Sequence, residues 1–295
     1  MSTRRIARAA IGVLVLAVMT AGPASAAKPI PPPTAPSGER SLTSEELAAA
    51  ERRLAASDAY LATIEMQGAD LASLSCVTPT GTAPQAAAPQ AAAPPCGVPQ
   101  GHLIVEARDQ TRGHYCGPAV GQVISNYSWA MKAGANKHTQ DRIAGWMATN
   151  ANGGTSAPFL EDGLELSTQG SPRRPAGWDW VVLDVRDRDR DGHTGDELQG
   201  YVRSNVSDAR MPLAIPVKPH GPGSGYYLVS WPRPVVSVGH WIAAYGWYSN
   251  YTGTAFARIY YTDSSKDEGG STGKFWDPTR DIAALIQEHT KRIVW

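Results

Sequence analysis

Four side chains of this sequence have the types and the order needed for acyl transfer through a thioester. Gln110 and Cys116 lie six residues apart, His240 follows a glycine in an apolar run, and Asp263 comes after Tyr-Tyr-Thr. A thiol can attack a carbonyl carbon, an imidazole can carry the proton, a carboxylate can orient the imidazole, and an amide can bind the oxyanion. Each residue type alone is more often structural, so it is the complete set that favours catalysis.

The first element that must position these groups is a helix beginning at Cys116. Pro118 suits a first helical turn, and apolar residues recur at helical spacing from Val120 to Met131. The N-terminus of a helix offers unpaired amide groups and the positive end of the helix dipole, which favour a thiolate. A nearby imidazolium at His240 would add positive charge, and the Cys116 amide and the Gln110 side chain could share the oxyanion.

The later half of the chain must supply the strands that carry the other two groups. Apolar runs at 180–185, 212–217, 240–247 and 255–262 predict strands, a second helix is expected near 140–149, and Asp277-Pro278 should start a terminal helix. Helices first and antiparallel strands later indicate an α+β domain. Asp263 then ends the strand beside that of His240, where it can hold the imidazole.

The N-terminal 26 residues have the features of a secretory signal peptide. Arg4-Arg5 precedes an apolar run from 9 to about 20, and Ala24-Ser25-Ala26 matches a cleavage site. The apolar run is too short for a permanent membrane span, and no later segment is apolar enough for one. Removal of this leader leaves 24 basic against 27 acidic residues, a net charge of −3, which gives no reason to expect nucleic acid as a partner. We expect a secreted, soluble and monomeric bacterial protein.

The cysteine count agrees with an extracellular thiol nucleophile. The chain has three cysteines, Cys76, Cys96 and Cys116. An oxidising compartment favours pairing, and an odd count leaves one thiol over. Cys76 and Cys96 bracket a Pro/Ala-rich loop, so we expect a disulfide between them and a free Cys116.

The chain divides into a leader, an irregular N-terminal region and one domain. Residues 27–100 combine a Pro-rich tether, a helix at about 44–74 and a low-complexity loop at 77–95, and residues 101–295 are long enough for one core. Thr43 and Glu46 have the spacing of a capping box at the start of that helix. The region could be a pro-segment that covers the cleft, or the helix could simply pack on the domain.

One loop has a partial calcium-binding pattern. Asp187, Asp189 and Asp191 precede a glycine at the spacing of an EF-hand loop, but Leu198 stands where the bidentate glutamate belongs. The arginines between these aspartates could instead neutralise them in a solvated loop. No paired metal motif supports zinc, and no other cofactor is indicated.

A Gly- and Pro-rich stretch before His240 predicts a loop beside the cleft. Tyr227 and Trp231 in this stretch, with Gly239 next to the histidine, are candidates for contact with a substrate. Ordinary packing of the aromatic rings under the loop is the alternative.

The chain from Gln110 onward resembles the papain-like cysteine peptidase clan. It is most similar to the bacteriocin-processing, double-glycine-leader peptidases. That family carries a glutamine followed by Tyr-Cys-Gly-Pro-Ala, which corresponds here to Gln110 and Tyr115–Ala119. It also carries Gly-His before an apolar strand and an aspartate after the next strand, which correspond here to Gly239-His240 and Asp263. The pattern within 139–155 is similar to exported actinobacterial-type members. The family usually has proline after the aspartate, and this chain has serine.

The resemblance implies a papain-like fold, with N-terminal helices packed on an antiparallel sheet, and a secreted thiol peptidase acting on a peptide or protein substrate. No transporter segments accompany the domain, so cleavage coupled to export is not implied. Two alternatives stay open. The same site could act on cell-wall peptides or transfer the acyl group to an amine, and the chain could be a non-catalytic secreted binding domain.

Overall fold

The structure is a computed structural model that describes residues 41–71, 100–188, 190, 192–231, 238–249, 257–265 and 270–295. Within the first range it describes side chains to residue 63. The expected leader, the tether, the low-complexity loop and the Cys76–Cys96 pair therefore lie outside the described residues, as do Asp189 and Asp191. All described residues belong to one unit, Pro32–Trp295.

Along the described chain most helices come before a run of four consecutive strands, and this order matches an α+β domain. The helices are α1 (Ser44–Leu71), α2 (Cys116–Ser128), α3 (Gln140–Trp146), α4 (Ala157–Thr168), α5 (Gly195–Arg203), the π-helical turn η1 (Ser204–Ala209) and α6 (Thr279–Gln287). The strands are β1 (Gln100–His102), β2 (Val182–Asp184), β3 (Leu213–Val217), β4 (His240–Tyr248), β5 (Arg258–Asp263), β6 (Gly273–Pro278) and β7 (Arg292–Val294). None of the described helices combines the length and the apolar composition needed to cross a membrane.

The described strands form one antiparallel sheet in the order β2-β7-β3-β4-β5-β6, and β1 pairs with the far half of β4. β4 lies in the middle and is buried along its whole length. Its start, His240, faces Val217 at the end of β3, and β5 runs antiparallel to it. The α+β prediction is confirmed, and so is the expectation that Asp263 ends the strand beside that of His240.

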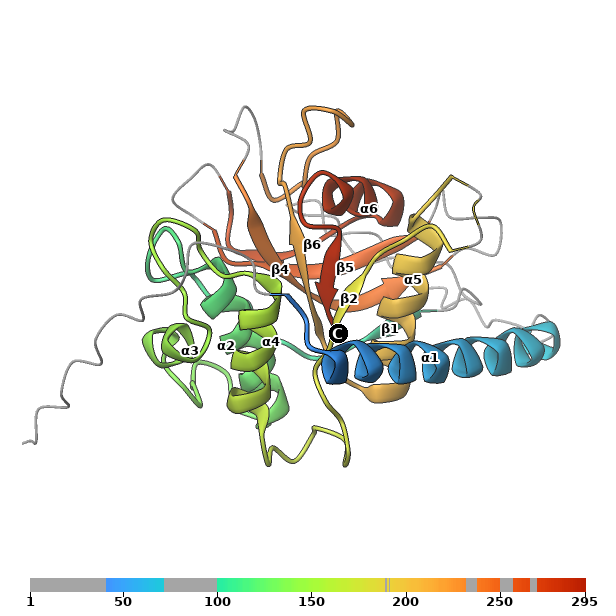
Figure 1. Cartoon of the computed structure of the whole chain (residues 1–295), viewed down its shortest axis with the longest axis horizontal. Coiled ribbons are helices and arrows are strands. Elements are labelled where there is room, and N and C mark those ends of the chain that lie inside the picture. Colours follow the sequence, from blue (N-terminus) through green and yellow to red (C-terminus); the bar gives the residue numbers. More distant parts are fainter. Residues whose placement is uncertain are drawn as a thin grey trace, which may run out of the picture. The chain divides into compact units, whose positions relative to one another are not determined.

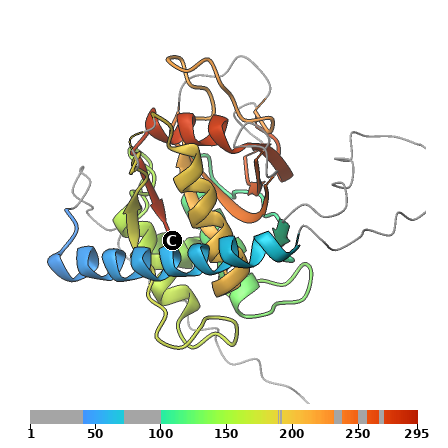
Figure 2. The ribbon, with the colours of Figure 1, turned by 90° about the vertical axis from the view of Figure 1, so that its right-hand side faces the viewer.

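Helices cover both faces of this sheet (Figures 1 and 2). In Figure 1, α2, α3 and α4 group on one side, and α5 and α6 lie on the other. The predicted inward face of α2 is confirmed, because Val120, Val123 and Ile124 belong to the buried core. α2 also packs against β4, so the helix that starts at Cys116 and the strand that starts at His240 are direct neighbours.

Several elements were not anticipated from the sequence. β1 and β7 have three residues each, too few for an alternating pattern to register. Asp277 and Pro278 were expected to begin the terminal helix, but they end β6, and α6 begins at Thr279. Proline is well suited to a position just before or at a helix start, so the same two residues are compatible with either assignment.

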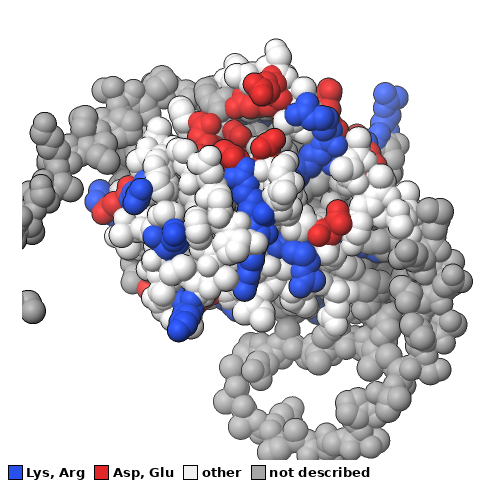
Figure 3. Space-filling model, turned by 90° about the horizontal axis from the view of Figure 1, so that it is seen from below, with Lys and Arg blue, Asp and Glu red and all other residues white. Residues whose placement is uncertain are grey.

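The helix α1 begins with the predicted capping box. The Thr43 amide donates to the Glu46 carboxylate at 2.5 Å, and the Glu46 amide donates to Thr43 Oγ1 at 3.2 Å. Most contacts of α1 lie on β2, η1 and α5, toward the β2 edge of the sheet. On the face seen in Figure 3, acidic side chains gather near the top and basic side chains run through the middle of the described surface.

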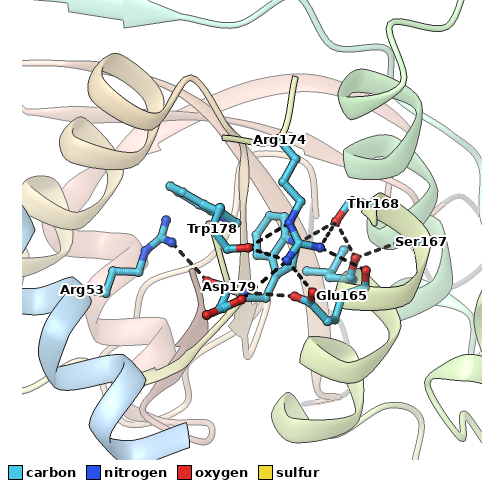
Figure 4. Close-up of polar contacts among 9 residues, drawn as sticks. Arg53, Glu165, Ser167, Thr168, Arg174, Trp178 and Asp179 are labelled. Carbon is cyan, nitrogen blue, oxygen red and sulfur yellow. Dashed lines mark hydrogen bonds and ion pairs between the residues drawn. The ribbon is translucent and has the colours of Figure 1, made fainter. Parts of the chain in front are cut away.

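Arg53 is the main anchor of α1. Its guanidinium lies 3.0 Å from the centroid of the Trp178 ring and donates to the Asp179 carbonyl and to Asn205. Figure 4 shows Arg174 on the other side of the same backbone, where it donates to the Trp178 carbonyl. These contacts lie near the C-terminal end of β7, which pairs with β3 near its start at Ala214. His240, at the start of β4, pairs with Val217 at the other end of β3. These contacts hold α1 on the domain.

Candidate active site

Cys116 is the first residue of α2 and is 8% exposed. Tyr115 is the N-cap residue of α2, and its side chain makes no hydrogen bond to the amide groups of the first helical turn. The first amide groups of a helix have no intrahelical acceptor, and they carry the positive end of the helix dipole. Cys116 is a free, buried thiol at this end of the helix.

Gln110 connects the loop before α2 to the end of β5. Its backbone amide donates to the Ser264 carbonyl at 2.9 Å, and its side-chain Oε1 lies 3.4 Å from the Ser264 hydroxyl, which donates to it. Its Nε2 donates to the Gly113 carbonyl at 2.8 Å. The side chain is thus buried between the loop that enters α2 and the residue after Asp263. One of its two amide hydrogens serves that loop.

Gln140, at the start of α3, holds the residues on both sides of Gln110. Its Nε2 donates to the Asp109 carbonyl at 2.7 Å, and its Oε1 accepts from the Thr111 amide at 2.9 Å. The sequence singled out Gln140 only through the family resemblance. Its structural role is to set the path of the chain through Gln110.

Gly117 allows a close approach that no other residue would permit. A Cβ at this position would lie 2.5 Å from Thr155 Oγ1 and 2.7 Å from Thr155 Cβ. Thr155 is held there from two sides, since its hydroxyl lies 2.6 Å from that of Thr149 and its carbonyl accepts from the Trp241 indole at 2.8 Å. The 149–155 segment therefore packs directly on the residue after the thiol.

His240 and Asp263 form a buried pair. His240 Nε2 lies 2.9 Å from Asp263 Oδ1, and the two residues are 3% and 1% exposed. The Cys116 side chain lies close enough to the same imidazole to raise its pKa. Because Nε2 is used by Asp263, Nδ1 is the ring nitrogen that remains for Cys116. The structure therefore brings together three of the four predicted residues in the order thiol, imidazole, carboxylate.

The electrostatics of the pair favour a charged imidazole. Burial opposes charge on His240, but the carboxylate of Asp263 and the Cys116 side chain outweigh it and raise the pKa of His240 to about 10. Burial likewise works against the Asp263 carboxylate, yet the imidazolium and the hydrogen bonds from Ser265 and Ser230 lower the pKa of Asp263. An imidazolium and a carboxylate at neutral pH are the consequence.

Asp263 is held by four donors, two on each oxygen. Oδ1 accepts from His240 and from the Ser265 amide at 2.9 Å, and Oδ2 accepts from the Ser230 hydroxyl at 2.7 Å and from the Trp231 indole at 2.9 Å. The Trp231 ring also meets the His240 ring edge to face, with centroids 5.0 Å apart. A carboxylate with this many donors has little freedom to rotate, so it fixes the plane of the imidazole.

The candidate substrate contacts lie in different surroundings. Trp231 is 1% exposed and supports Asp263, which differs from the position expected of a residue lining an open groove. Tyr227 is 42% exposed and stacks on His220.

Gly239 makes room for His289, because a Cβ there would lie 2.4 Å from His289 Nε2. Burial and the charges of Lys218 and His240 lower the pKa of His289 to about 4, so that ring is neutral.

The calcium prediction is described only in part. The Asp187 carboxylate accepts from the Gly192 amide at 2.8 Å, which closes the loop, and the other two aspartates of the pattern lie outside the described residues. Elsewhere, the carboxylates of Glu46, Glu161 and Asp162 lie within 4.8 Å of one another. Calcium takes six to eight oxygen ligands, so three carboxylates alone do not define such a site.

Sequence reasoning missed the residues that support Asp263 from behind. Ser230 precedes it by 33 positions and belongs to no helix or strand, so no periodicity marks it.

Comparison with known proteins adds no assignment: no family model matches this chain, and no curated protein matches it.

Proposed function

We propose that this chain is an exported cysteine peptidase of the papain-like class, which hydrolyses peptide bonds through a thioester acyl-enzyme. One observation carries the proposal. The Cys116 thiol, at the start of a helix, lies against His240, whose other ring nitrogen is held by the buried Asp263. Helices packed against an antiparallel sheet that carries the histidine and the aspartate on adjacent strands also support a papain-like arrangement.

In the resting enzyme the Cys116 thiolate faces the His240 imidazolium. The thiolate attacks the carbonyl carbon of the peptide, and the carbonyl electrons move to oxygen. The Cys116 backbone amide and the second amide hydrogen of Gln110 would bind that oxyanion, each worth roughly 3 kcal/mol to the transition state. His240 then gives its proton to the leaving nitrogen, the C–N bond breaks, and a thioester remains.

Water completes the reaction. The neutral His240 takes a proton from the water molecule as its oxygen attacks the thioester carbon, and the thiolate leaves. Asp263 stays ionised throughout and holds the imidazole in the tautomer that carries hydrogen on Nε2. Transfer of the acyl group to an amine, or cleavage of a cell-wall peptide, would use the same steps with a different acceptor or substrate.

The first test is labelling of the mature protein with iodoacetamide and with the peptidase inactivator E-64, followed by intact mass. We expect fast addition of one label at pH 6, none to Cys116→Ala, and slow addition to His240→Ala. A peptide library would then define the substrate, and the products would separate hydrolysis from acyl transfer. A folded protein with a free thiol that reacts no faster than His240→Ala would support a non-catalytic binding domain instead.

A further inference from the structure

A second buried carboxylate, Asp277 at the end of β6, is connected to Asp263 by hydroxyl groups. The Tyr261 hydroxyl lies 2.6 Å from Asp277 Oδ2, and the same hydroxyl lies 3.1 Å from Ser230 Oγ. Ser230 Oγ in turn lies 2.7 Å from Asp263 Oδ2. We call these four residues, Asp277, Tyr261, Ser230 and Asp263, the carboxylate chain. It is buried throughout.

The carboxylate chain has three contacts, and the two hydroxyl groups supply only two hydrogens. With both carboxylates ionised, Tyr261 donates to Asp277 and Ser230 donates to Asp263, so the 3.1 Å contact between the two hydroxyl oxygens contains no hydrogen. A third hydrogen must come from one of the carboxyl groups. With it, every contact is a hydrogen bond, and buried polar groups are strongly disfavoured without such partners.

Asp277 is the carboxyl group suited to hold that hydrogen. Asp263 faces an imidazolium and accepts from four donors, all of which favour its ionised form. The groups that face Asp277 are the Tyr261 hydroxyl from β5, the Val229 amide at 3.1 Å, and the carboxylate of Asp281 from α6. Asp277 has no cation among them.

The titration behaviour of these groups agrees with the hydrogen count. Burial raises the pKa of Asp277 to about 6, the hydrogen bonds from Tyr261 and Val229 oppose this, and the charge of Asp281 adds to it. Burial and the nearby Asp277 hold the pKa of Tyr261 well above its usual value, so its hydroxyl keeps its proton. The proton that completes the chain is therefore gained or lost in mildly acidic solution.

We propose that Asp277 is a positioning residue for the His240–Asp263 pair, acting through Tyr261 and Ser230, and that its protonation state adjusts the charge of His240. This rests on the proposed function of the same site. Protonated Asp277 donates to Tyr261, Tyr261 to Ser230, and Ser230 to Asp263, so each donor is strengthened by the one before it. Ionised Asp277 breaks this sequence and adds a negative charge, which favours the imidazolium.

The test measures the charge on His240 through two alkylating reagents. Iodoacetate is an anion that an imidazolium attracts, and iodoacetamide is neutral, so the ratio of their rates at Cys116 follows the His240 charge. The ratio is measured from pH 4 to pH 10 for the full-length mature protein and for Asp277→Asn. Asparagine is the matched variant because it carries no charge at any pH and its NH₂ group can donate to Tyr261, although the Val229 amide then loses its acceptor.

We expect the ratio to stay high from pH 4 to about pH 8 in both proteins, because His240 is charged over that range, and to fall at alkaline pH as His240 loses its proton. The alkaline limb of the variant should move to lower pH by about one unit, the low end of the effect of a neighbouring charge. Tyr261→Phe and Ser230→Ala should also move the alkaline limb, because each interrupts the chain while both carboxyl groups stay in place. A residue that only supports the fold would scale the rates and leave the shape of the profile unchanged.

Two controls separate this inference from the function on which it rests. His240→Ala should flatten the ratio at all pH values. If it does not, the Cys116–His240 pair itself is wrong. If His240→Ala flattens the ratio while folded Asp277→Asn keeps the alkaline limb of the wild type, the pair stands and the role of Asp277 is refuted. Should Asp277→Asn fail to fold, Tyr261→Phe and Ser230→Ala decide by the same criterion.

Discussion

Replacement of Asp263 by asparagine isolates the charge that holds His240. The substitution keeps the size of the side chain but removes the negative charge beside a 3% exposed imidazole. It also leaves one acceptor oxygen where two accept now. Whichever way the asparagine amide turns, its NH₂ group faces two donors, either His240 and the Ser265 amide or Ser230 and Trp231.

The size of the effect follows from the pKa of His240. A value of about 10, against an ordinary 6.5, corresponds to about 5 kcal/mol in favour of the charged form. Removal of one partner from a buried ion pair costs roughly 3–5 kcal/mol. Without Asp263, burial lowers the pKa of His240 and only the Cys116 side chain opposes it, so the charged imidazole should be much less favoured at pH 7.5. We therefore expect a loss of about 3–5 kcal/mol in the free energy of unfolding at pH 6.

The pH dependence has a definite sign. The raised pKa of His240 contributes stability that is fully present below pH 6.5 and is lost as the pH rises toward 10. The lowered pKa of Asp263 contributes stability that is present above about pH 4 and is lost as the pH falls through its folded value. The difference between wild type and Asp263→Asn should consequently be largest from about pH 4.5 to pH 6.5 and shrink at pH 9.5.

The assay is urea denaturation at pH 6.0, 7.5 and 9.5, together with the rate of iodoacetamide labelling of Cys116. Asp58→Asn is the matched control, because Asp58 pairs with Arg188 at the surface and its loss should cost less than about 1 kcal/mol. Equal unfolding midpoints for wild type and Asp263→Asn at pH 6, with the same labelling profile, would refute the idea that Asp263 holds His240 as a cation.

Three further predictions test other parts of the structure. Gly117→Ala should destabilise the protein by about 1–3 kcal/mol and slow thiol labelling, because its Cβ would overlap Thr155. The control Gly145→Ala, with no atom within 4 Å of the new Cβ, should be neutral or stabilising in denaturation experiments. Equal effects of the two substitutions would contradict the close approach of Gly117 to Thr155. Arg53→Ala should lower the free energy of unfolding by about 1–2 kcal/mol through loss of its cation–π contact and leave the rate of Cys116 labelling unchanged. Faster labelling would instead identify α1 as a cover of the site. Asp277 has a raised pKa of about 6, so wild-type stability should fall by up to about 3 kcal/mol as the pH rises from 4 to 7. In denaturation experiments over this pH range, Asp277→Asn should lack that fall. The same fall in the variant would show that Asp277 is not its source.

The sequence by itself was sufficient where the signal is local. The helix beginning at Cys116 follows from the proline and the apolar spacing after it, and the capping box at Thr43 follows from two residues three positions apart. The strands of His240 and Asp263 were predicted as neighbours because consecutive antiparallel strands tend to pair. These inferences need only the periods of helices and strands and the short range of the chain.

The tertiary structure decided which distant groups meet those residues. Periodicity cannot indicate that Ser230 and Trp231 hold the second oxygen of Asp263, since both lie in an irregular segment more than 30 positions away. The same is true of Thr155 against Gly117 and of Tyr261 between two carboxyl groups. Contacts of this kind arise from the packing of whole elements and from the need to give every buried polar atom a partner, and neither has a period that a sequence displays. The candidate site was therefore predicted from four residue types in order, but the charge of His240 depends on neighbours that only the folded chain brings together.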